Sequence, residues 1–324
     1  MTVFSSTRIP CPRIITYNIS SLSSMASTAK GQRRRHRVIA TIKSLLGQCE
    51  ILCLQETWLG KKNDSELKKE FPEPEYYIKY NNDRKGHGGT IIIIKKEVTD
   101  NYQMEDVNLG DKAAGRVQGL FFKSKAFPKI PKASFSVGNV YLTSGKGAGA
   151  ERIKQLKIIR GFNKEAHLYL VGDFNMTENP EDSPTGTSYL HGTKDERDDW
   201  RAIKEEMGLH EHHQEDHTHY NVTEDINHCR TSRIDRIYST LGDTDFLLRN
   251  PICYIAPGGG KAYDAFQVEK GMEGASERFR RAYLSDHMPV VLAFVSGEAS
   301  KRRAPNLPKW AGAIKGIGAK RSQL

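Results

Sequence analysis

The polar residues best suited to chemistry in this chain lie at the ends of apolar runs. Ser285-Asp286-His287 directly precedes Met288–Phe294, an apolar run that predicts a buried β-strand. A carboxylate beside an imidazole at a strand edge can hold a metal-bound phosphate, because one group binds the cation while the other donates to a phosphoryl oxygen. Such a site needs partners from other strand ends.

Further polar clusters occupy the required positions. They are Tyr17-Asn18, Gln55-Glu56-Thr57 and Gly172-Asp173-Phe174-Asn175, each after a predicted strand, and Ser232-Arg233-Ile234-Asp235, which opens one. Each cluster alone has a structural explanation as a turn, a cap or a surface acid. Strand ends at one edge of a sandwich converge in space, so their joint occurrence favours one shared pocket.

The residue types in these clusters indicate a division of work. Glu56 offers a hard oxygen ligand to Mg²⁺, which takes one or two carboxylates and fills its other positions with water and phosphate oxygens. Asp173 can orient or deprotonate a water for in-line attack, with Asn175 fixing that water or the phosphate. Asp235 can hold the His287 ring so that its other nitrogen faces the phosphate.

The elements that must position these residues follow from hydrophobic patterns. Strands are predicted at 13–17, 51–54, 88–94, 117–122, 134–142, 168–171, 233–238 and 288–294, and helices at 150–164, at 195–207 and from the arginine-rich segment to Leu46. Many strands with few helices predict an α/β (α+β) domain in which two packed sheets are flanked by helices. We expect this domain to span residues 13–296, after an N-terminal extension (1–12) and before a basic, disordered tail or linker (297–324).

The net charge of +10 is concentrated in two segments. Residues 296–324 carry seven lysines and arginines against one glutamate, and residues 25–40 carry five against none. Arg33, Arg34, Arg35 and Arg37 are predicted to lie in the first turn of a helix, where they oppose the helix dipole. Binding to phosphates of a polyanion explains them better, although a solvated tail and helix start is the alternative explanation.

Composition excludes several other classes. No apolar stretch is long enough to span a bilayer, so we expect no membrane partner. The N-terminus lacks a signal-peptide pattern, and five cysteines without paired spacing favour reduced thiols. We therefore expect an intracellular protein, cytosolic or nuclear.

One further segment invites an interpretation that we reject, and another predicts a loop. Histidines 210, 212, 213, 217 and 219 lack the regular spacing and thiolates of a zinc site, so a His-rich surface strand and loop is the better interpretation. Gly258-Gly259-Gly260 follows a proline and predicts a mobile loop.

The order of the polar clusters resembles the exonuclease-endonuclease-phosphatase superfamily over residues 13–295. The motifs are most similar to those of the apurinic-type endonuclease domain of LINE (non-LTR) retrotransposons. These motifs are Leu54-Gln55-Glu56-Thr57-Trp58-Leu59, Gly138-Asn139-Val140-Tyr141, Gly172-Asp173-Phe174-Asn175, Ser232-Arg233-Ile234-Asp235-Arg236-Ile237 and Ser285-Asp286-His287. Leu307-Pro308-Lys309-Trp310 is similar to the segment that joins such endonucleases to a reverse transcriptase.

The resemblance implies a four-layered, DNase I-like α/β sandwich with two mixed sheets, and a role for each matching residue. Asn18 and Glu56 line the metal site with Asp286 close by, and Tyr141 contacts the scissile phosphate. Asp173 and Asn175 handle the nucleophile, and Asp235 orients His287. Two positions depart from the family pattern: Ser20 and Ser21 weaken an outer metal contact, and Leu142-Thr143-Ser144 replaces the usual phosphate-facing loop.

These features together predict a Mg²⁺-dependent DNA endonuclease, with Mn²⁺ as the alternative ion. It would nick one strand, leave a 3′-hydroxyl that primes reverse transcription, and act as a nuclear monomer fused to or derived from a reverse transcriptase polyprotein. Arg33, Arg34, Arg35, Arg37, Arg116 and Lys146 are expected to grip backbone phosphates. The alternatives are an abasic-site repair endonuclease, a deadenylase, an inositol phosphatase or an inactive nucleic-acid-binding module.

Overall fold

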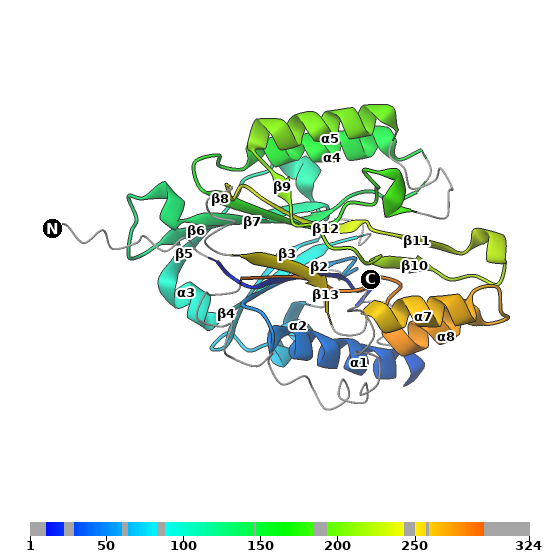
Figure 1. Ribbon diagram of the computed structural model, residues 1–324. Coiled ribbons are helices and arrows are strands. Elements are labelled where there is room, and N and C mark those ends of the chain that lie inside the picture. Colours follow the sequence, from blue (N-terminus) through cyan, green and yellow to red (C-terminus); the bar gives the residue numbers. More distant parts are fainter. Residues whose placement is uncertain are drawn as a thin grey trace, which may run out of the picture.

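Two six-stranded sheets form the centre of the molecule (Figure 1). The computed structural model describes residues 11–22, 29–59, 64–82, 88–145, 147–183, 193–242, 250–256 and 259–294. The first sheet has the order β13 (Pro251–Ile255), β14 (Val290–Phe294), β1 (Ile14–Asn18), β2 (Ile51–Gln55), β4 (Thr90–Lys95), β3 (Tyr76–Asn81). The second has the order β5 (Tyr102–Asp106), β6 (Val117–Ser124), β7 (Phe135–Tyr141), β8 (His167–Asp173), β12 (Asp235–Ser239), β9 (His210–Glu211).

Both sheets are mixed. β1 and β2 run parallel in the first sheet, as β7 and β8 do in the second, and the other pairings in each sheet are antiparallel. The parallel pairs bring the carboxyl ends of four strands to one edge of the sandwich. The antiparallel neighbours β12 and β14 begin at that same edge. This edge is therefore where side chains from both sheets can meet.

Apolar side chains between the sheets join them into one core. Ile51, Ile92 and Leu292 of the first sheet pack in the same cluster as Phe122 and Val171 of the second, all fully buried. Burying one such side chain contributes about 1.5–3 kcal/mol relative to leaving it in water. Both faces of the central strands are covered, which explains why their sequences are continuously apolar rather than alternating.

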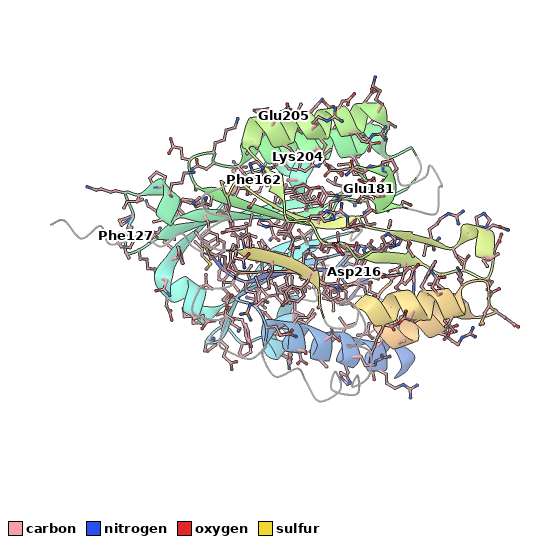
Figure 2. All side chains as sticks on the ribbon, in the orientation of Figure 1. Phe127, Phe162, Glu181, Lys204, Glu205 and Asp216 are labelled. Atoms are coloured by element: carbon pink, nitrogen blue, oxygen red, sulfur yellow. The ribbon has the colours of Figure 1, made fainter. Side chains whose placement is uncertain are left out.

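Helices cover the two outer faces. α1 (Ala29–Leu46) lies on the first sheet, through the buried residues Val38, Ile39 and Ile42. α4 (Gly149–Ile158) and α5 (Lys194–Met207) lie on the second, through Leu156 and Trp200. Figure 2 shows side chains filling the space between α4–α5 and the second sheet, where Phe162 is buried, whereas Glu205 lies on the exposed side of α5. The predicted four-layered sandwich is confirmed.

A small lobe lies beside the sandwich (Figure 1). It combines the hairpin β10 (His219–Asn221) and β11 (Arg230–Ser232) with the helices α7 (Gly259–Glu269) and α8 (Ala275–Tyr283). Tyr220, Phe266 and Phe279 form its separate apolar cluster. Gly259 and Gly260 begin α7, so the prediction of a loop was wrong for these two residues. Within the described ranges, the other α-helices are α2 (Asp64–Glu70) and α3 (Lys96–Asn101).

No described helix combines the length and apolar character that a membrane span requires.

Candidate active site

Hydrogen-bond register assembles the site at the shared edge of the sheets. Asp173 ends β8, and it pairs directly with Tyr141, the last residue of β7, on one side and with Asp235, the first residue of β12, on the other. Asn18 ends β1 in the other sheet, and His287 lies just before β14. Residues separated by up to 269 positions thus meet, as in the contact between Asn18 and His287.

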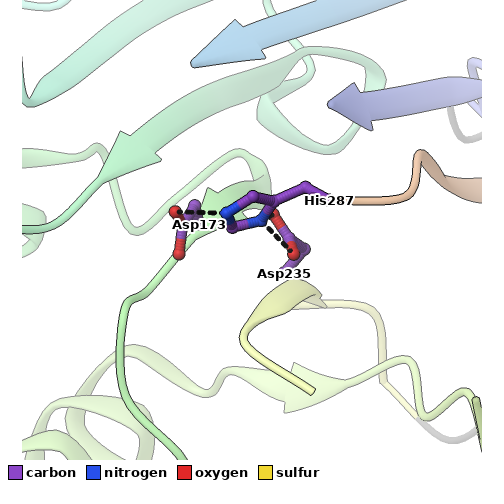
Figure 3. Close-up of side chains that lie close together, drawn as sticks. All are labelled: Asp173, Asp235 and His287. Carbon is purple, nitrogen blue, oxygen red and sulfur yellow. Dashed lines mark hydrogen bonds and ion pairs between the residues drawn. The ribbon is translucent and has the colours of Figure 1, made fainter. Parts of the chain in front are cut away.

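Asp173, His287 and Asp235 form the buried half of the site (Figure 3). His287 Nδ1 donates to Asp235, with distances of 2.9 Å to Oδ2 and 3.1 Å to Oδ1. A carboxylate only accepts, so this bond places a proton on Nδ1. Nε2 of the same ring lies 3.9 Å from Asp173 Oδ2. One imidazole therefore lies between two carboxylates.

The charges of this group are set by burial and by one another. Burial alone would lower the pKa of His287, but the charge and hydrogen bond of Asp235, with further help from Asp173 and Asp286, raise it to about 10. The imidazole is therefore a cation at neutral pH. Asn18 Nδ2 lies 3.4 Å from His287 Nε2. Both atoms carry hydrogens when the ring is charged, so this contact is a packing contact rather than a hydrogen bond.

Asp173 is surrounded by donors. Its Oδ2 accepts from Asn18 Nδ2 at 2.9 Å and from Asn175 Nδ2 at 3.0 Å, and its Oδ1 accepts from the Asn175 backbone N–H at 2.8 Å. Burial raises the pKa of Asp173, His287 opposes this shift, and Asp235 and Glu56 add to it, giving about 7. A carboxyl with a pKa near neutrality suits a general base.

The turn after β8 explains the Gly-Asp-Phe-Asn sequence. Gly172 has φ +143°, and a Cβ there would lie 1.9 Å from the Val140 carbonyl oxygen, so only glycine fits. Phe174 is fully buried against Trp200 and Tyr238, which anchors the turn. Asn175 has φ 48°, a left-handed conformation that asparagine tolerates better than most residues. The turn thereby directs the Asn175 side chain back to Asp173.

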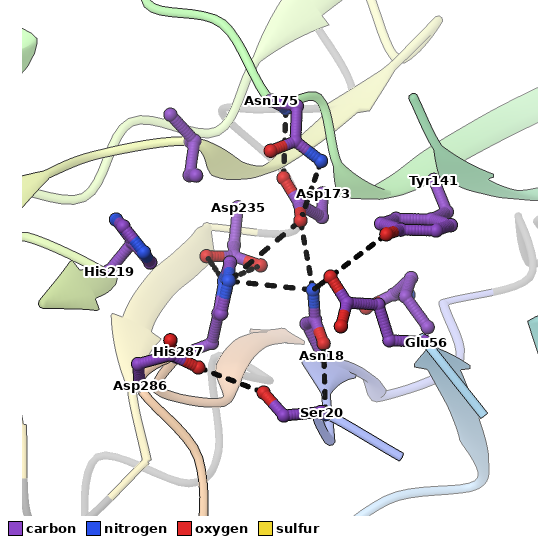
Figure 4. Close-up of polar contacts among 12 residues, drawn as sticks. Asn18, Ser20, Glu56, Tyr141, Asp173, Asn175, His219, Asp235, Asp286 and His287 are labelled. Atoms are coloured by element: carbon purple, nitrogen blue, oxygen red, sulfur yellow. Dashed lines mark hydrogen bonds and ion pairs between the residues drawn. The ribbon is translucent and has the colours of Figure 1, made fainter. Parts of the chain in front are cut away.

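Glu56 and the buried Tyr141 form the other half of the site, which we call the open half because the Glu56 side chain is half-buried (Figure 4). Glu56 Oε1 accepts from Tyr141 Oη at 2.9 Å and from Asn18 Nδ2 at 3.1 Å. Glu56 Oε2 has no hydrogen-bond partner within the described ranges, and the side chain is half-buried. Burial, followed by the charges of Glu56 and Asp173, raises the pKa of Tyr141, so the hydroxyl stays protonated. The Arg116 guanidinium lies over the Tyr141 ring, 4.7 Å from its centroid.

Asp286 lies at the margin of these two groups. Its Oδ1 accepts from Ser20 Oγ at 2.8 Å and its Oδ2 from Arg280 Nη2 at 2.9 Å. Burial would raise the pKa of Asp286, but the charges of His287 and Arg280 and the Ser20 hydroxyl keep it below its usual range. Among the described residues, no hydrogen bond joins Asp286 to Glu56. Ser20, which the sequence comparison treated as a weakened metal contact, therefore orients Asp286.

A divalent cation fits the open half better than the buried half. Ligand atoms of Asp173, Asp235 and His287 lie within 4.8 Å of one another. The His287 imidazolium and the surrounding donors already satisfy those carboxylates. Glu56 Oε2, by contrast, is a carboxylate oxygen without a protein donor in the described part of the chain. Hard cations such as Mg²⁺ prefer this kind of ligand.

Buried ion pairs fix the start of β12. Arg233 Nε donates to Asp182 Oδ1 at 2.9 Å, and Arg236 Nη1 donates to Glu211 Oε1 at 2.8 Å. The arginines on either side of Asp235 therefore hold the backbone in place rather than facing a ligand. The Asp235 backbone N–H also donates to Thr218 Oγ1, at 3.0 Å.

The predicted DNA-contacting residues have diverse environments. Arg33 and Arg37 are exposed on α1, and Arg35 is half-buried. Arg34 differs from the prediction, because its guanidinium donates to the carbonyls of Ser20 (3.0 Å) and Leu284 (3.1 Å) and so braces the loops before and after the site. Lys146 lies outside the described residues, as does the basic tail 297–324.

The position of these arginines corrects one premise of the sequence argument. α1 begins at Ala29, so Arg33 lies one turn further into the helix than predicted. The unfavourable interaction with the helix dipole is confined to the first turn, and it does not apply to these residues.

Sequence reasoning missed His219, which lies beside His287 with ring centroids 4.7 Å apart. It belongs to the His-rich segment that was interpreted as a surface strand and loop. That interpretation was wrong for His212, which is buried with its Nε2 2.7 Å from Ser239 Oγ. Within the described residues, the His-rich segment forms no group of three converging metal ligands. The alternation in Thr218-His219-Tyr220 was the available signal for a strand.

Two mixed sheets that converge on an acid–imidazole pocket define a class of phosphoester hydrolases, and comparison with known proteins agrees. The chain belongs to the Endonuclease/Exonuclease/phosphatase family, whose model matches residues 15–287. It is therefore a hydrolase of phosphoester bonds, and the predicted family is confirmed. Exodeoxyribonucleases of two Streptococcus pneumoniae strains are 25% identical over 205 residues, covering 57% of this chain and 70% of theirs.

Solved structures share the fold. An AP endonuclease from Archaeoglobus fulgidus is similar with a TM-score of 0.57 at 21% identity, over 87% of this chain and 98% of that chain. An AP endonuclease from Leishmania major gives 0.60 at 14% identity, over 87% of each chain. The endonuclease domain of TRAS1, a telomere-specific non-LTR retrotransposon, gives 0.53 at 12% identity, over 88% of this chain and 99% of that chain. The predicted likeness to a LINE-type endonuclease fold is thereby confirmed.

Proposed function

We propose that this protein is a Mg²⁺-dependent DNA endonuclease that nicks one strand and leaves a 3′-hydroxyl. The observation that carries the proposal is the hydrogen-bonded network at the shared sheet edge, where Asn18 links Glu56 in the open half to Asp173 in the buried half (Figure 4). The names of the exodeoxyribonuclease relatives and of the AP and retrotransposon endonuclease neighbours support a nucleic-acid substrate.

Asp173 is the proposed general base. Its raised pKa lets it take a proton from a water that attacks phosphorus. Asn175 and Asn18 each donate one amide hydrogen to its Oδ2, so the carboxylate is held in one orientation before substrate arrives. That fixed geometry contributes to catalysis because no reorganisation is needed during the reaction.

His287 is the proposed electrostatic stabiliser. With Nδ1 donating to Asp235, the cationic ring can donate from Nε2 to a phosphoryl oxygen on which charge develops. Asp235 acts through His287 by fixing its tautomer and orientation. We propose that the Tyr141 hydroxyl, at the edge of the open half, contacts the scissile phosphate.

Glu56 and Asn18 are the residues that would hold Mg²⁺, or Mn²⁺ in its place, with Asp286 at the margin. When bound, the cation supplies charge that neutralises phosphoryl oxygens. Glu56 Oε2 has no protein donor within the described ranges, and it is the atom that fits this role.

The basic residues Arg33, Arg35, Arg37, Arg116 and Lys146 are proposed contacts for backbone phosphates, in keeping with the net charge of +10. We further propose that the enzyme derives from a LINE-type polyprotein, acts in the nucleus as a monomer, and provides the 3′-hydroxyl as a primer for a reverse transcriptase. The motif set and the tail segment Leu307–Trp310 support this origin.

The test is a plasmid nicking assay with Mg²⁺, with EDTA as the control and with mapping of the ends. We expect supercoiled DNA to become nicked without any abasic lesion, and the nick to be extended by a polymerase that requires a 3′-hydroxyl. Activity confined to abasic DNA would overturn the proposal in favour of a repair endonuclease. DNA binding without cleavage, in wild type and Asp173→Ala alike, would indicate an inactive binding module.

A further inference from the structure

His219 is a second imidazole at the site. It opens β10, and its backbone forms an isolated antiparallel bridge with His287. The two rings lie 4.7 Å apart between centroids and are tilted by 50°. In Figure 4, His219 lies on the far side of His287 from Asn18 and Glu56. The reaction as proposed above leaves His219 without a task.

The tautomer of His219 follows from its neighbour Ser232. Ser232 Oγ lies 3.2 Å from His219 Nδ1 across the hairpin, and the register pairs the two residues directly. The hydroxyl proton of Ser232, a fully buried residue, has no other acceptor within the described ranges. Ser232 therefore donates to Nδ1, and the proton of the neutral ring is on Nε2.

The Nε2–H donor of His219 lacks an acceptor. No hydrogen bond to it exists in the part of the chain that the structure describes, and the side chain is only half-buried. His219 Nε2 is not one of the buried atoms that lack a partner, so water can reach it in the free protein. A ligand that enters the site can replace that water and accept the hydrogen bond.

The cations near His219 are already paired within the protein. His287 Nδ1 is bonded to Asp235, and Arg280 Nη2 to Asp286, whose backbone oxygen accepts from Tyr220 N–H at 2.8 Å, one residue from His219. The His219 Nε2–H group is therefore the donor beside His287 that an incoming acceptor can use, and a phosphate oxygen is a strong acceptor for it. The strand that enters the site carries such a group at every nucleotide.

We propose that His219 donates from Nε2 to the phosphate that adjoins the scissile phosphate, on the side away from Glu56. This inference rests on the proposed DNA endonuclease function. His287 serves the phosphate that is cleaved, and His219 serves its neighbour and sets the register of the strand. The effect is on substrate binding, since His219 does not touch the reacting atoms.

The test combines a variant with a substrate lacking single charges. His219→Phe keeps an aromatic ring against His287 and removes the donor. Binding to a short duplex containing a mapped nick site is measured in EDTA by fluorescence anisotropy, with each phosphate near the nick replaced in turn by a neutral methylphosphonate. We expect His219→Phe to weaken binding by about tenfold, the value of one hydrogen bond of this kind, with kcat within about twofold of wild type.

The decisive result is non-additivity. At the phosphate that adjoins the scissile phosphate, methylphosphonate should weaken DNA binding by the wild type but not DNA binding by His219→Phe. At the other positions, both proteins should lose the same factor in affinity. His213→Phe is the matched control, because His213 is exposed in the same segment. Ser232→Ala keeps the His219 ring but removes the hydrogen bond that fixes its tautomer. This variant should therefore show a smaller loss of DNA affinity than His219→Phe.

Two failures are distinguishable. Wild type that nicks DNA while His219→Phe binds as tightly, or additive losses at every phosphate, would overturn the role of His219 and leave the endonuclease standing. Wild type that neither binds nor nicks DNA would overturn the proposed function and this inference with it. If His219→Phe does not fold, the same methylphosphonate measurements are made with Ser232→Ala. Additive losses of affinity at every phosphate in that variant would count against the inference.

Discussion

The two halves of the site differ in how completely the protein satisfies its own charges. In the buried half, Asp173, Asp235 and His287 are enclosed, and their donors and acceptors are matched. In the open half, Glu56 is half-buried and keeps one carboxylate oxygen without a described donor. The hydrogen bonds of the buried half therefore fix its proton positions before substrate binds. The open half keeps one carboxylate oxygen available, and an external cation and the substrate can bind there.

The largest effect should come from the buried half. Asp173→Asn keeps the shape of the side chain and removes the proposed base, so kcat should fall by about 10³-fold or more. Nicking is measured under single-turnover conditions, with circular dichroism to confirm the fold. Asp198→Asn, at an exposed carboxylate on α5, is the control and should leave kcat unchanged. Retention of wild-type kcat by Asp173→Asn would remove Asp173 from the mechanism.

Asp235→Asn tests whether the buried half acts through the charge of His287. We expect kcat/KM to fall by about 10²-fold, because the ring loses the carboxylate charge that stabilises its protonated form and fixes its orientation. The raised pKa of His287, about 10, means that the charged form is present below that pH and is lost as pH rises through it.

Without Asp235 the His287 pKa should fall, so the alkaline limb of the pH profile of kcat/KM should move to lower pH. Profiles measured between about pH 6 and pH 10 check this. The acid limb in wild type should lie near 7, where Asp173 loses its proton. An alkaline limb that does not move would show that it belongs to another group.

Glu56→Gln tests the open half. Removing one charge should weaken the apparent affinity for Mg²⁺ by about 10–100-fold, and most of the activity should return at high Mg²⁺. Titration of nicking rate against Mg²⁺ measures this. The same titration on Asp235→Asn is the comparison, and saturating Mg²⁺ should not restore that variant. If Glu56→Gln and Asp235→Asn showed the same Mg²⁺ dependence, the two halves of the site would not differ in metal binding.

The smallest effect is expected outside both halves. Arg33→Ala removes an exposed cation of α1, so DNA binding should weaken by a few-fold, and the slope of log affinity against log salt should become shallower by about 1. Arg34→Lys should instead lower the thermal stability, because its guanidinium braces backbone carbonyls. An unchanged salt slope in Arg33→Ala would show that Arg33 does not contact phosphate.

Central strands and their polar ends were predictable from the sequence. β2, β4 and β8 are buried on both faces and have continuous apolar sequences, so they were identified together with the residues that follow them. Edge strands were missed, because β3 is half-buried at every position and contains polar residues. α7 and α8 were missed because they are short, with 11 and 9 residues, and contribute few large apolar side chains, such as Phe266 and Phe279, to the cluster of the lobe.

Part of the site could not be predicted from sequence patterns. Asp173 and Asn175 could be found because a glycine turn after a strand has a local signature. His219 could not, since it lies in a short hairpin strand and not in a polar cluster at the end of a long apolar run, and only an isolated bridge joins it to His287. The bracing by Arg34 was also hidden, because its partners are backbone carbonyls, which any sequence provides.

One buried contact beneath the site has a consequence for folding. Asn139 of β7 donates to the carbonyls of Leu54 (3.1 Å) and Ile91 (3.0 Å) in the opposite sheet, and it accepts from Gln55 Nε2 at 2.7 Å. These bonds can form only when both sheets have docked in register. Because Glu56 follows Gln55 and Tyr141 follows Asn139 by two residues, the same docking event assembles the open half. During refolding, recovery of nicking should therefore follow the slow burial of aromatic side chains and not the earlier gain of secondary structure.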